Sequence, residues 1–169
     1  QVPSFKNMKK EELIKSLEEK FPKRITEVFR KVRREEFVPE EDKKYAYENI
    51  PLFIGYGATI SQPYTIAFML DLLKVKNKQK ILEVGSGSGY VLALLSELSP
   101  NGKIFGIERI KELAESSEEK LKQYKNVKVI HGNGFKGLEK EALFDRILVS
   151  ASAEKIPYSL ISQLKEKGI

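Results

Sequence analysis

The sequence of 169 residues predicts an α/β fold, with helices on both faces of a mainly parallel sheet. From Lys80 onward, short apolar runs alternate with segments of helical periodicity, which is the pattern of repeated strand–helix–strand units. Before this alternation, apolar residues recur at the spacing of amphipathic helices. Because no repeat or linker divides the chain, we expect a single domain over residues 1–169, with an N-terminal part (1–78) and a sheet-forming core (79–169).

The N-terminal part is expected to begin with two helices, at Lys9 to Lys20 and at about Ile25 to Arg34. Residues 45–60 mix proline and glycine with tyrosine and isoleucine, so we expect a structured loop there. A third helix is expected to start at Ser61, with this serine as its N-cap and Pro63 in its first turn.

Four strands and the helices between them are predicted in the core. The strands are expected at Lys80 to Val84, Lys103 to Ile107, Val127 to Ile130 and Arg146 to Val149. The helices are expected at Tyr90 to Leu98, Ile110 to Tyr124, Lys136 to Glu141 and Tyr158 to Lys167, the last capped by Gly168. In open parallel sheets the ligand lies beyond the carboxyl ends of the strands, so the residues directly after each strand are the candidates for function.

The composition excludes several kinds of site. Cysteine is absent, which leaves no disulfide and no thiolate ligand or nucleophile, and we expect no metal site. No apolar run approaches the roughly 20 residues of a membrane span, so we expect a cytoplasmic protein without a membrane partner. The formal net charge is +6, but basic pairs such as Arg33-Arg34 lie beside glutamates. This pattern favours a solvated helix face over a nucleic-acid site.

A glycine-rich turn follows the first strand of the predicted sheet and contains Gly85, Gly87 and Gly89. Glycine lets the main chain approach a ligand closely, and the following helix starts with unpaired N–H groups. Glu108 ends the second strand, where a carboxylate can accept hydrogen bonds from ribose hydroxyls. These features together predict a nucleoside-binding site, and a purely structural turn is the alternative.

The glycine spacing distinguishes between the candidate cofactors. Dinucleotide-binding loops carry a third small residue that lets helix and strand pack closely, and Tyr90 occupies that place here. The loop has instead the spacing Gly85-x-Gly87-x-Gly89, which resembles that of S-adenosylmethionine-dependent methyltransferases. No Walker lysine follows the loop, which argues against a triphosphate.

Several stretches resemble the protein-L-isoaspartate O-methyltransferase family in order and spacing. They are PLFIGYGATISQP (residues 51–63), ILEVGSGSGY, FGIER, HGNG and FDRILVSASAEKIP. The resemblance extends from about Leu13 to the last residue, and Gly57 to Pro63 is its most diagnostic part. It implies a Rossmann-like methyltransferase sheet, S-adenosyl-L-methionine as cofactor, and methylation of the free carboxylate of L-isoaspartyl residues in damaged proteins and peptides. This is a protein-repair reaction.

The resemblance also implies which residues form the site. Ser61 is placed in the catalytic centre, where we expect it to bind the substrate carboxylate or order the loop; a helix N-cap is an equal alternative. Its neighbours in the active-site loop are Ala58, Thr59, Ile60 and Gln62. The expected cofactor-binding residues are Glu83, Gly85, Ser86, Gly87, Gly89, Glu108, Arg109, Asn133 and Gly134. Asn133 stands where the family usually has aspartate near the adenine amino group, so its contact would lack a charge.

The implied chemistry needs no general base, because the substrate carboxyl group, with a pKa of about 3.9, is already ionised at neutral pH. Orientation and desolvation should then determine the rate. The single histidine, His131, and Asp145, which precedes the fourth strand, are both expected to be structural.

The chain departs from the family at its end. After Ile169 the family continues into a fifth strand and an antiparallel pair, so we expect C-terminal strands to be missing and the fourth strand to be an edge. A naturally short relative, or a partner that covers the edge, are the alternatives. The oligomeric state is left open.

Two other functions compete with the repair methyltransferase. The first is a nucleic-acid methyltransferase. Amino-methylating DNA enzymes share an Asp/Asn-Pro-Pro-aromatic motif after the fourth strand, where this chain has Ser150 to Ala153, so a nucleic-acid partner is not expected. The second is a non-catalytic module that binds the cofactor.

Overall fold

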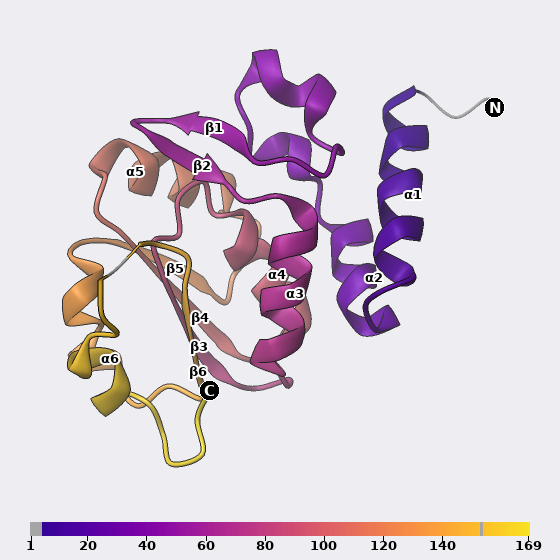
Figure 1. The fold of residues 1–169 in the computed structure, drawn as a ribbon. Helices are drawn as coiled ribbons and strands as arrows, with labels where there is room; N and C mark the ends of the chain where they lie inside the picture. The colour runs from indigo at the N-terminus through magenta and orange to yellow at the C-terminus, as the bar shows by residue number, and fades with distance from the viewer. Residues whose placement is uncertain (1–4, 153) are drawn as a thin grey trace.

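The computed structural model describes residues 5–152 and 154–169 (Figure 1). A parallel sheet of four strands lies at its centre, in the order β5-β4-β3-β6. The strands are β3 (Lys80–Val84), β4 (Lys103–Glu108), β5 (Val127–His131) and β6 (Arg146–Val149). These bounds confirm the predicted strands, two of them to the residue and two with one residue added at the carboxyl end.

The inner strands β3 and β4 are apolar on both faces, as expected where helices cover a parallel sheet on both sides. On one face Ile81 and Ile104 belong to the larger buried cluster, which also contains most of the apolar helix residues. On the other face Leu82 and Phe105 pack with Leu160 of the last helix. The alternation along each strand therefore divides the core into two layers.

Helices cover the sheet as Figure 1 shows, with α3 and α4 on one side and α6 on the other. Their bounds are α3 (Pro63–Leu73), α4 (Tyr90–Leu98), α5 (Lys111–Lys120) and α6 (Tyr158–Ser162). α4 ends where it was predicted to end, whereas α5 and α6 are shorter than predicted. None of the helices in the described part of the chain is long and apolar enough to cross a bilayer.

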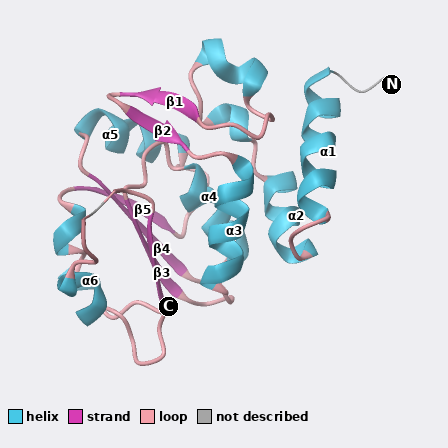
Figure 2. Ribbon diagram, viewed as in Figure 1, coloured by secondary structure: helices cyan, strands magenta, loops and turns pink. Residues whose placement is uncertain are grey.

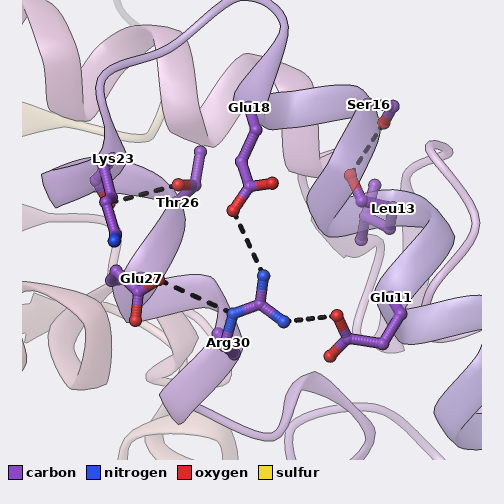
Figure 3. Close-up of polar contacts among 8 residues, drawn as sticks. All are labelled: Glu11, Leu13, Ser16, Glu18, Lys23, Thr26, Glu27 and Arg30. Atoms are coloured by element: carbon purple, nitrogen blue, oxygen red, sulfur yellow. Dashed lines mark hydrogen bonds and ion pairs between the residues drawn. The ribbon is translucent and has the colours of Figure 1, made fainter.

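Two N-terminal helices, α1 (Phe5–Glu18) and α2 (Lys23–Lys31), form an outer layer against α3 and α4. Arg30 of α2 links them by ion pairs to Glu11 and Glu18 of α1, and it lies 3.7 Å from Glu27 of its own helix (Figure 3). These groups are partly exposed, so the pairs stabilise weakly. The buried apolar face of α2 therefore determines how the layer is oriented.

A β-hairpin over residues 52–60 occupies the second part of the structured loop predicted for residues 45–60, and the prediction is wrong there, whereas residues 46–51 form no helix or strand. Strands β1 (Leu52–Gly55) and β2 (Ala58–Ile60) pair antiparallel, apart from the parallel sheet (Figure 2). The two connecting residues have positive φ, 55° at Tyr56 and 71° at Gly57, which is the requirement of a tight two-residue hairpin turn. The strands are too short to show a clear alternation in sequence.

Three helix predictions also need correction. Pro63 lies in the first turn of α3 as expected, but the helix starts at this residue and its N-cap position is Gln62 and not Ser61. The N–H of Tyr64 donates instead to Oδ1 of Asn49, at 2.9 Å, so a distant side chain does the capping. Over residues 136–141 the chain forms two 3-10 turns, η3 (Gly134–Lys136) and η4 (Glu139–Glu141), rather than a helix, because Gly137 interrupts it with a φ of 62°.

The last helix ends at Ser162 and not at Lys167, so the predicted cap at Gly168 was wrong. Residues 163–169 instead run beside the start of β6, where the N–H of Ile147 donates to the carbonyl of Ile169 at 2.8 Å. β6 is the last strand of the sheet, as predicted, but its amino-terminal half is not a free edge.

Candidate active site

A cavity of about 510 Å³ opens at the carboxyl ends of the four parallel strands. The segments that follow β3, β4, β5 and β6 all contribute to its wall, and the tip of the β1–β2 hairpin closes one side. It is lined by Tyr56, Gly57, Ala58, Thr59, Val84, Gly85, Gly87, Ile107, Glu108, Arg109, Ile110, Asn133, Gly134, Phe135, Val149, Ser150, Ala151, Ser152, Pro157 and Leu160. A mostly apolar wall with few polar groups is typical of cofactor sites.

The glycine-rich turn forms the part of this wall that follows β3. The N–H of Gly85 donates to the carbonyl of Ile107 at 2.8 Å, which binds the turn to the end of β4. Gly85 has a φ of 81°, and a Cβ atom there would lie 2.7 Å from the Cβ of Ala151. The absence of a side chain at residue 85 is therefore a steric requirement of the turn.

Glu108 is the only carboxylate of the cavity wall within the described residues, and its side chain is held in place by main-chain donors. Its Oε2 accepts a hydrogen bond from the N–H of Gly87 at 2.8 Å, and its Oε1 accepts one from the N–H of Ile110 at 2.9 Å. Each oxygen retains a further lone pair. Two fixed acceptors side by side fit the adjacent hydroxyls of a ribose.

Glu83 lies behind the wall and does not line the cavity. Its Oε1 accepts a hydrogen bond at 2.7 Å from Oγ of Ser150, which does line it, and its Oε2 has no partner in the described structure. The pKa of Glu83 is raised to about 8, chiefly by burial and to a smaller extent by the nearby charge of Glu108, while the hydrogen bond from Ser150 opposes the rise. At neutral pH Glu83 is therefore mainly protonated, and it acts on the crevice through Ser150.

Asn133 and Gly134 form the wall after β5. Oδ1 of Asn133 accepts a hydrogen bond from the N–H of Phe135 at 3.0 Å, which fixes the amide at the cavity edge. A Cβ on Gly134 would lie 2.3 Å from Cγ1 of Val84, so the chain here passes directly over the end of β3. This close approach places the Asn133 amide beside the apolar end of β3 in the cavity wall, a combination that suits an adenine ring.

The structure brings together eight of the residues predicted from sequence, since the cavity wall includes Ala58, Thr59, Gly85, Gly87, Glu108, Arg109, Asn133 and Gly134. It leaves Glu83, Ser86, Gly89, Ile60, Ser61 and Gln62 outside that wall. At Gly89 a Cβ would lie 2.7 Å from Cδ1 of Leu121, so the packing of α5 and its C-terminal cap explains this glycine. Among the other titratable candidates, Nε2 of His131 lies 3.2 Å from the carbonyl of Arg109, and Asp145 accepts a hydrogen bond from the N–H of Lys80.

Sequence reasoning missed the residues after β6 and several apolar wall residues. Ser150 could have been found, because it directly follows the fourth strand and the same rule applies there. Phe135 and Pro157 carried no local signal, since they come from irregular segments that only the tertiary fold brings to the cavity.

The parallel sheet, the glycine turn after β3 and the fixed carboxylate at the end of β4 define the class of protein. It is an S-adenosylmethionine-dependent methyltransferase with a Rossmann-like fold. Residues 8–169 match the family model of protein-L-isoaspartate(D-aspartate) O-methyltransferase, and the chain belongs to this family.

Curated relatives agree with this assignment. The chain is 47% identical over 167 residues to a protein-L-isoaspartate O-methyltransferase of Ignicoccus hospitalis, covering 95% of this chain and 79% of that protein. It is 46% identical over 164 residues to one of Methanothrix thermoacetophila, covering 95% of this chain and 78% of that protein. The match therefore spans about four fifths of each of these relatives.

Solved structures share the fold. A crystal structure from Plasmodium falciparum, described as a protein-L-isoaspartate O-methyltransferase with S-adenosyl-L-homocysteine, has a TM-score of 0.81 and 30% identity over 93% of this chain and 80% of its own. Another protein-L-isoaspartate O-methyltransferase has a TM-score of 0.87 and 26% identity over 94% of this chain, but this chain covers 53% of it.

Proposed function

We propose that this chain transfers a methyl group from S-adenosyl-L-methionine to the free carboxylate of L-isoaspartyl residues in damaged proteins and peptides, in the cytoplasm. The observation that carries the proposal is the cavity, which has cofactor-type groups on one wall and the β1–β2 hairpin on the other. In this division the N-terminal part, residues 1–78, supplies the substrate side. The core, residues 79–169, supplies the cofactor side.

The cofactor side would hold the nucleoside by three sets of groups. Glu108 accepts hydrogen bonds from the ribose hydroxyls, and the glycines of the turn allow the cofactor to approach the main chain. Asn133 and the N–H of Gly134 face the adenine edge. When bound, S-adenosyl-L-methionine supplies an electrophilic methyl group on its sulfonium sulfur.

The substrate side needs groups that orient a carboxylate and exclude water, and it needs no proton acceptor. Ser61 follows β2 directly, two residues beyond Thr59, which lines the cavity. In the described structure the Ser61 hydroxyl has no hydrogen-bond partner, and the N-cap position of α3 is Gln62. A hydroxyl that is not engaged in capping is available to donate to a substrate carboxylate.

The reaction is tested by offering three substrates with labelled S-adenosyl-L-methionine: an isoaspartyl peptide, the same peptide with normal aspartate, and RNA. We expect label only on the isoaspartyl peptide, as a base-labile methyl ester. Base-stable label on RNA would favour a nucleic-acid methyltransferase. Cofactor binding without any transfer would favour a non-catalytic module.

Ser61→Ala tests the role of the hydroxyl. We expect kcat to fall by about tenfold, the value of one hydrogen bond to a charged group, while the Kd of the cofactor changes little. The control is Ser16→Ala on α1, which removes a serine hydroxyl that donates locally to Leu13 and should leave kcat unchanged. A Ser61→Ala variant that alters only the melting temperature would remove Ser61 from the catalytic centre.

A further inference from the structure

We propose that Arg34 is a positioning residue that fixes the β1–β2 hairpin over the cofactor crevice; its catalytic consequence rests on the proposed function. Arg34 lies in the short 3-10 turn η1 (Arg34–Glu36) and is 0% exposed. Nη1 donates to the carbonyl of Ala46 at 2.7 Å and to that of Glu48 at 3.5 Å. Nη2 donates to the carbonyl of Ile50 at 3.2 Å and to that of Ser61 at 3.0 Å.

These four acceptors surround the base of the hairpin. Ala46, Glu48 and Ile50 precede β1, whereas Ser61 follows β2, so one guanidinium joins the chain that enters the hairpin to the chain that leaves it. The hairpin has only a short two-stranded ladder, and such a unit is marginally stable alone. Its tip, which lines the cavity, therefore depends on how the base is held.

Arg34 also contacts the cofactor side. Its guanidinium lies 6.0 Å from the centroid of the Tyr90 ring, and Tyr90 is the first residue of α4, directly after the glycine turn. The Tyr90 ring is buried and packs against Phe37 at 5.5 Å and Phe29 at 6.3 Å between centroids. One side chain thus connects the hairpin to the helix that starts at the cofactor turn.

The chemistry of Arg34 indicates a geometric role. Burying a charge is unfavourable, and an apolar side chain could fill the same space. In the described structure the hydrogen-bond acceptors of Arg34 are main-chain carbonyls, and its Nε has no partner. The planar guanidinium of arginine can donate to four carbonyls in fixed directions. The ammonium group of lysine has only three N–H donors on one nitrogen, so it cannot make all four hydrogen bonds.

A second buried arginine supplies a matched control. Arg146 starts β6, at the amino end of the sheet and away from the crevice, and it is 8% exposed. It also donates to main-chain carbonyls, those of Leu73 at 2.6 Å, Lys74 at 3.2 Å and Asp145 at 2.7 Å. Substitution of Arg146 therefore removes similar hydrogen bonds to main-chain carbonyls and leaves the contacts of the hairpin intact.

Amide hydrogen exchange of the ligand-free protein tests the positioning role independently of any reaction. In Arg34→Lys we expect exchange in residues 46–62 to become about tenfold faster or more, with little change in β3 and β4, because local opening becomes easier. In Arg146→Lys we expect faster exchange near residues 73–74 and no change in the hairpin. Unchanged hairpin exchange in Arg34→Lys, or an equal increase along the whole chain, would overturn the proposal.

Kinetics then connect position to activity. We expect Arg34→Lys to lower kcat/KM for an isoaspartyl peptide by about 100-fold, as small misplacements do, while the Kd of S-adenosyl-L-methionine changes by less than about threefold. Arg146→Lys should leave both unchanged at a temperature where each variant is folded. A loss confined to cofactor binding contradicts the proposal. If wild type transfers no methyl group, the proposed function fails, but the exchange result still decides the role of Arg34.

If Arg34→Lys melts below the assay temperature, Arg34→Gln is measured in the same way. Its amide keeps two donors for the carbonyls of the hairpin base and removes the buried charge. Hairpin exchange faster than in wild type, with little change in β3 and β4, would support the role of the guanidinium fork. Exchange as slow as in wild type would show that the fork is not required.

Discussion

The two walls of the crevice are held by different kinds of contact. On the cofactor wall, Glu108 accepts from Gly87 and Ile110, and Gly85 donates to Ile107, so neighbouring strand ends bind one another. On the hairpin wall, the base is held by one arginine whose acceptors lie 12 to 27 residues further along the chain. The first wall follows from local motifs and sheet register, whereas the second depends on long-range side-chain contacts, most of them made by Arg34 and a further one by Asn49 to Tyr64.

The largest expected effect distinguishes two glycines that both have a positive φ, Gly85 and Gly55. Gly85→Ala on the cofactor wall should lower the free energy of unfolding by about 2–4 kcal/mol, because a strained φ adds to a clash with Ala151. It should also abolish measurable cofactor binding in calorimetry. Gly55→Ala in the hairpin, at a φ of 91° with nothing within 4 Å, should lose only about 1–2 kcal/mol and keep cofactor affinity. Equal losses in both variants would show that the clash does not matter.

The next effect concerns the carboxylate. Glu108→Ala should weaken cofactor binding by on the order of 1–3 kcal/mol, because it removes charge-assisted hydrogen bonds. Calorimetry measures this, with Glu115→Ala as the control, since Glu115 makes an exposed ion pair with Lys111. Hairpin exchange should stay as in wild type, and faster hairpin exchange would show that the two walls are not independent.

The smallest effect, counted for each pH unit, is a pH dependence of the stability, which arises from Glu83 behind the cofactor wall. The pKa of Glu83 is raised to about 8 in the folded state, mainly by burial, so the folded protein keeps a proton that the unfolded chain has lost. The stability that Glu83 contributes is fully present below its unfolded pKa of about 4.5, and it is lost as the pH rises through the folded pKa of about 8. The loss is at most about 1.4 kcal/mol for each pH unit.

Glu83→Gln should remove this slope, because the amide does not titrate. The free energy of unfolding, measured in urea from pH 5 to pH 8 without cofactor, should then vary less with pH than in wild type. An unchanged slope would show that other groups cause it.

The sequence predicted the parallel strands and the glycine turn with its following helix well, because their signals are local. β3, α4 and β6 have the predicted bounds, since buried strands and a glycine turn each impose a short pattern. The hairpin was missed because its strands are too short for a pattern. Ser61 resembled an N-cap, but Asn49, far away in sequence, makes that contact.

Arg34 shows most clearly what sequence alone could not supply. It stands beside Arg33 in a stretch that predicts a solvated, charged helix face, and for Arg33 that is correct, since its side chain is 62% exposed. Arg34 is fully buried. Nothing in the local composition separates the two residues, because only the return of the chain at residues 46–61 supplies the carbonyl acceptors.

The packing around Tyr90 constrains how this protein could change over time. The Tyr90 ring meets Phe29, Arg34 and Phe37, which all come from residues 29–37, and Tyr90 is also the first residue of the helix after the glycine turn. A smaller residue at any one of these positions would leave a void or expose a buried charge to apolar surroundings. Substitutions here should therefore be inherited in compensating pairs, and related sequences should vary at these positions together rather than singly.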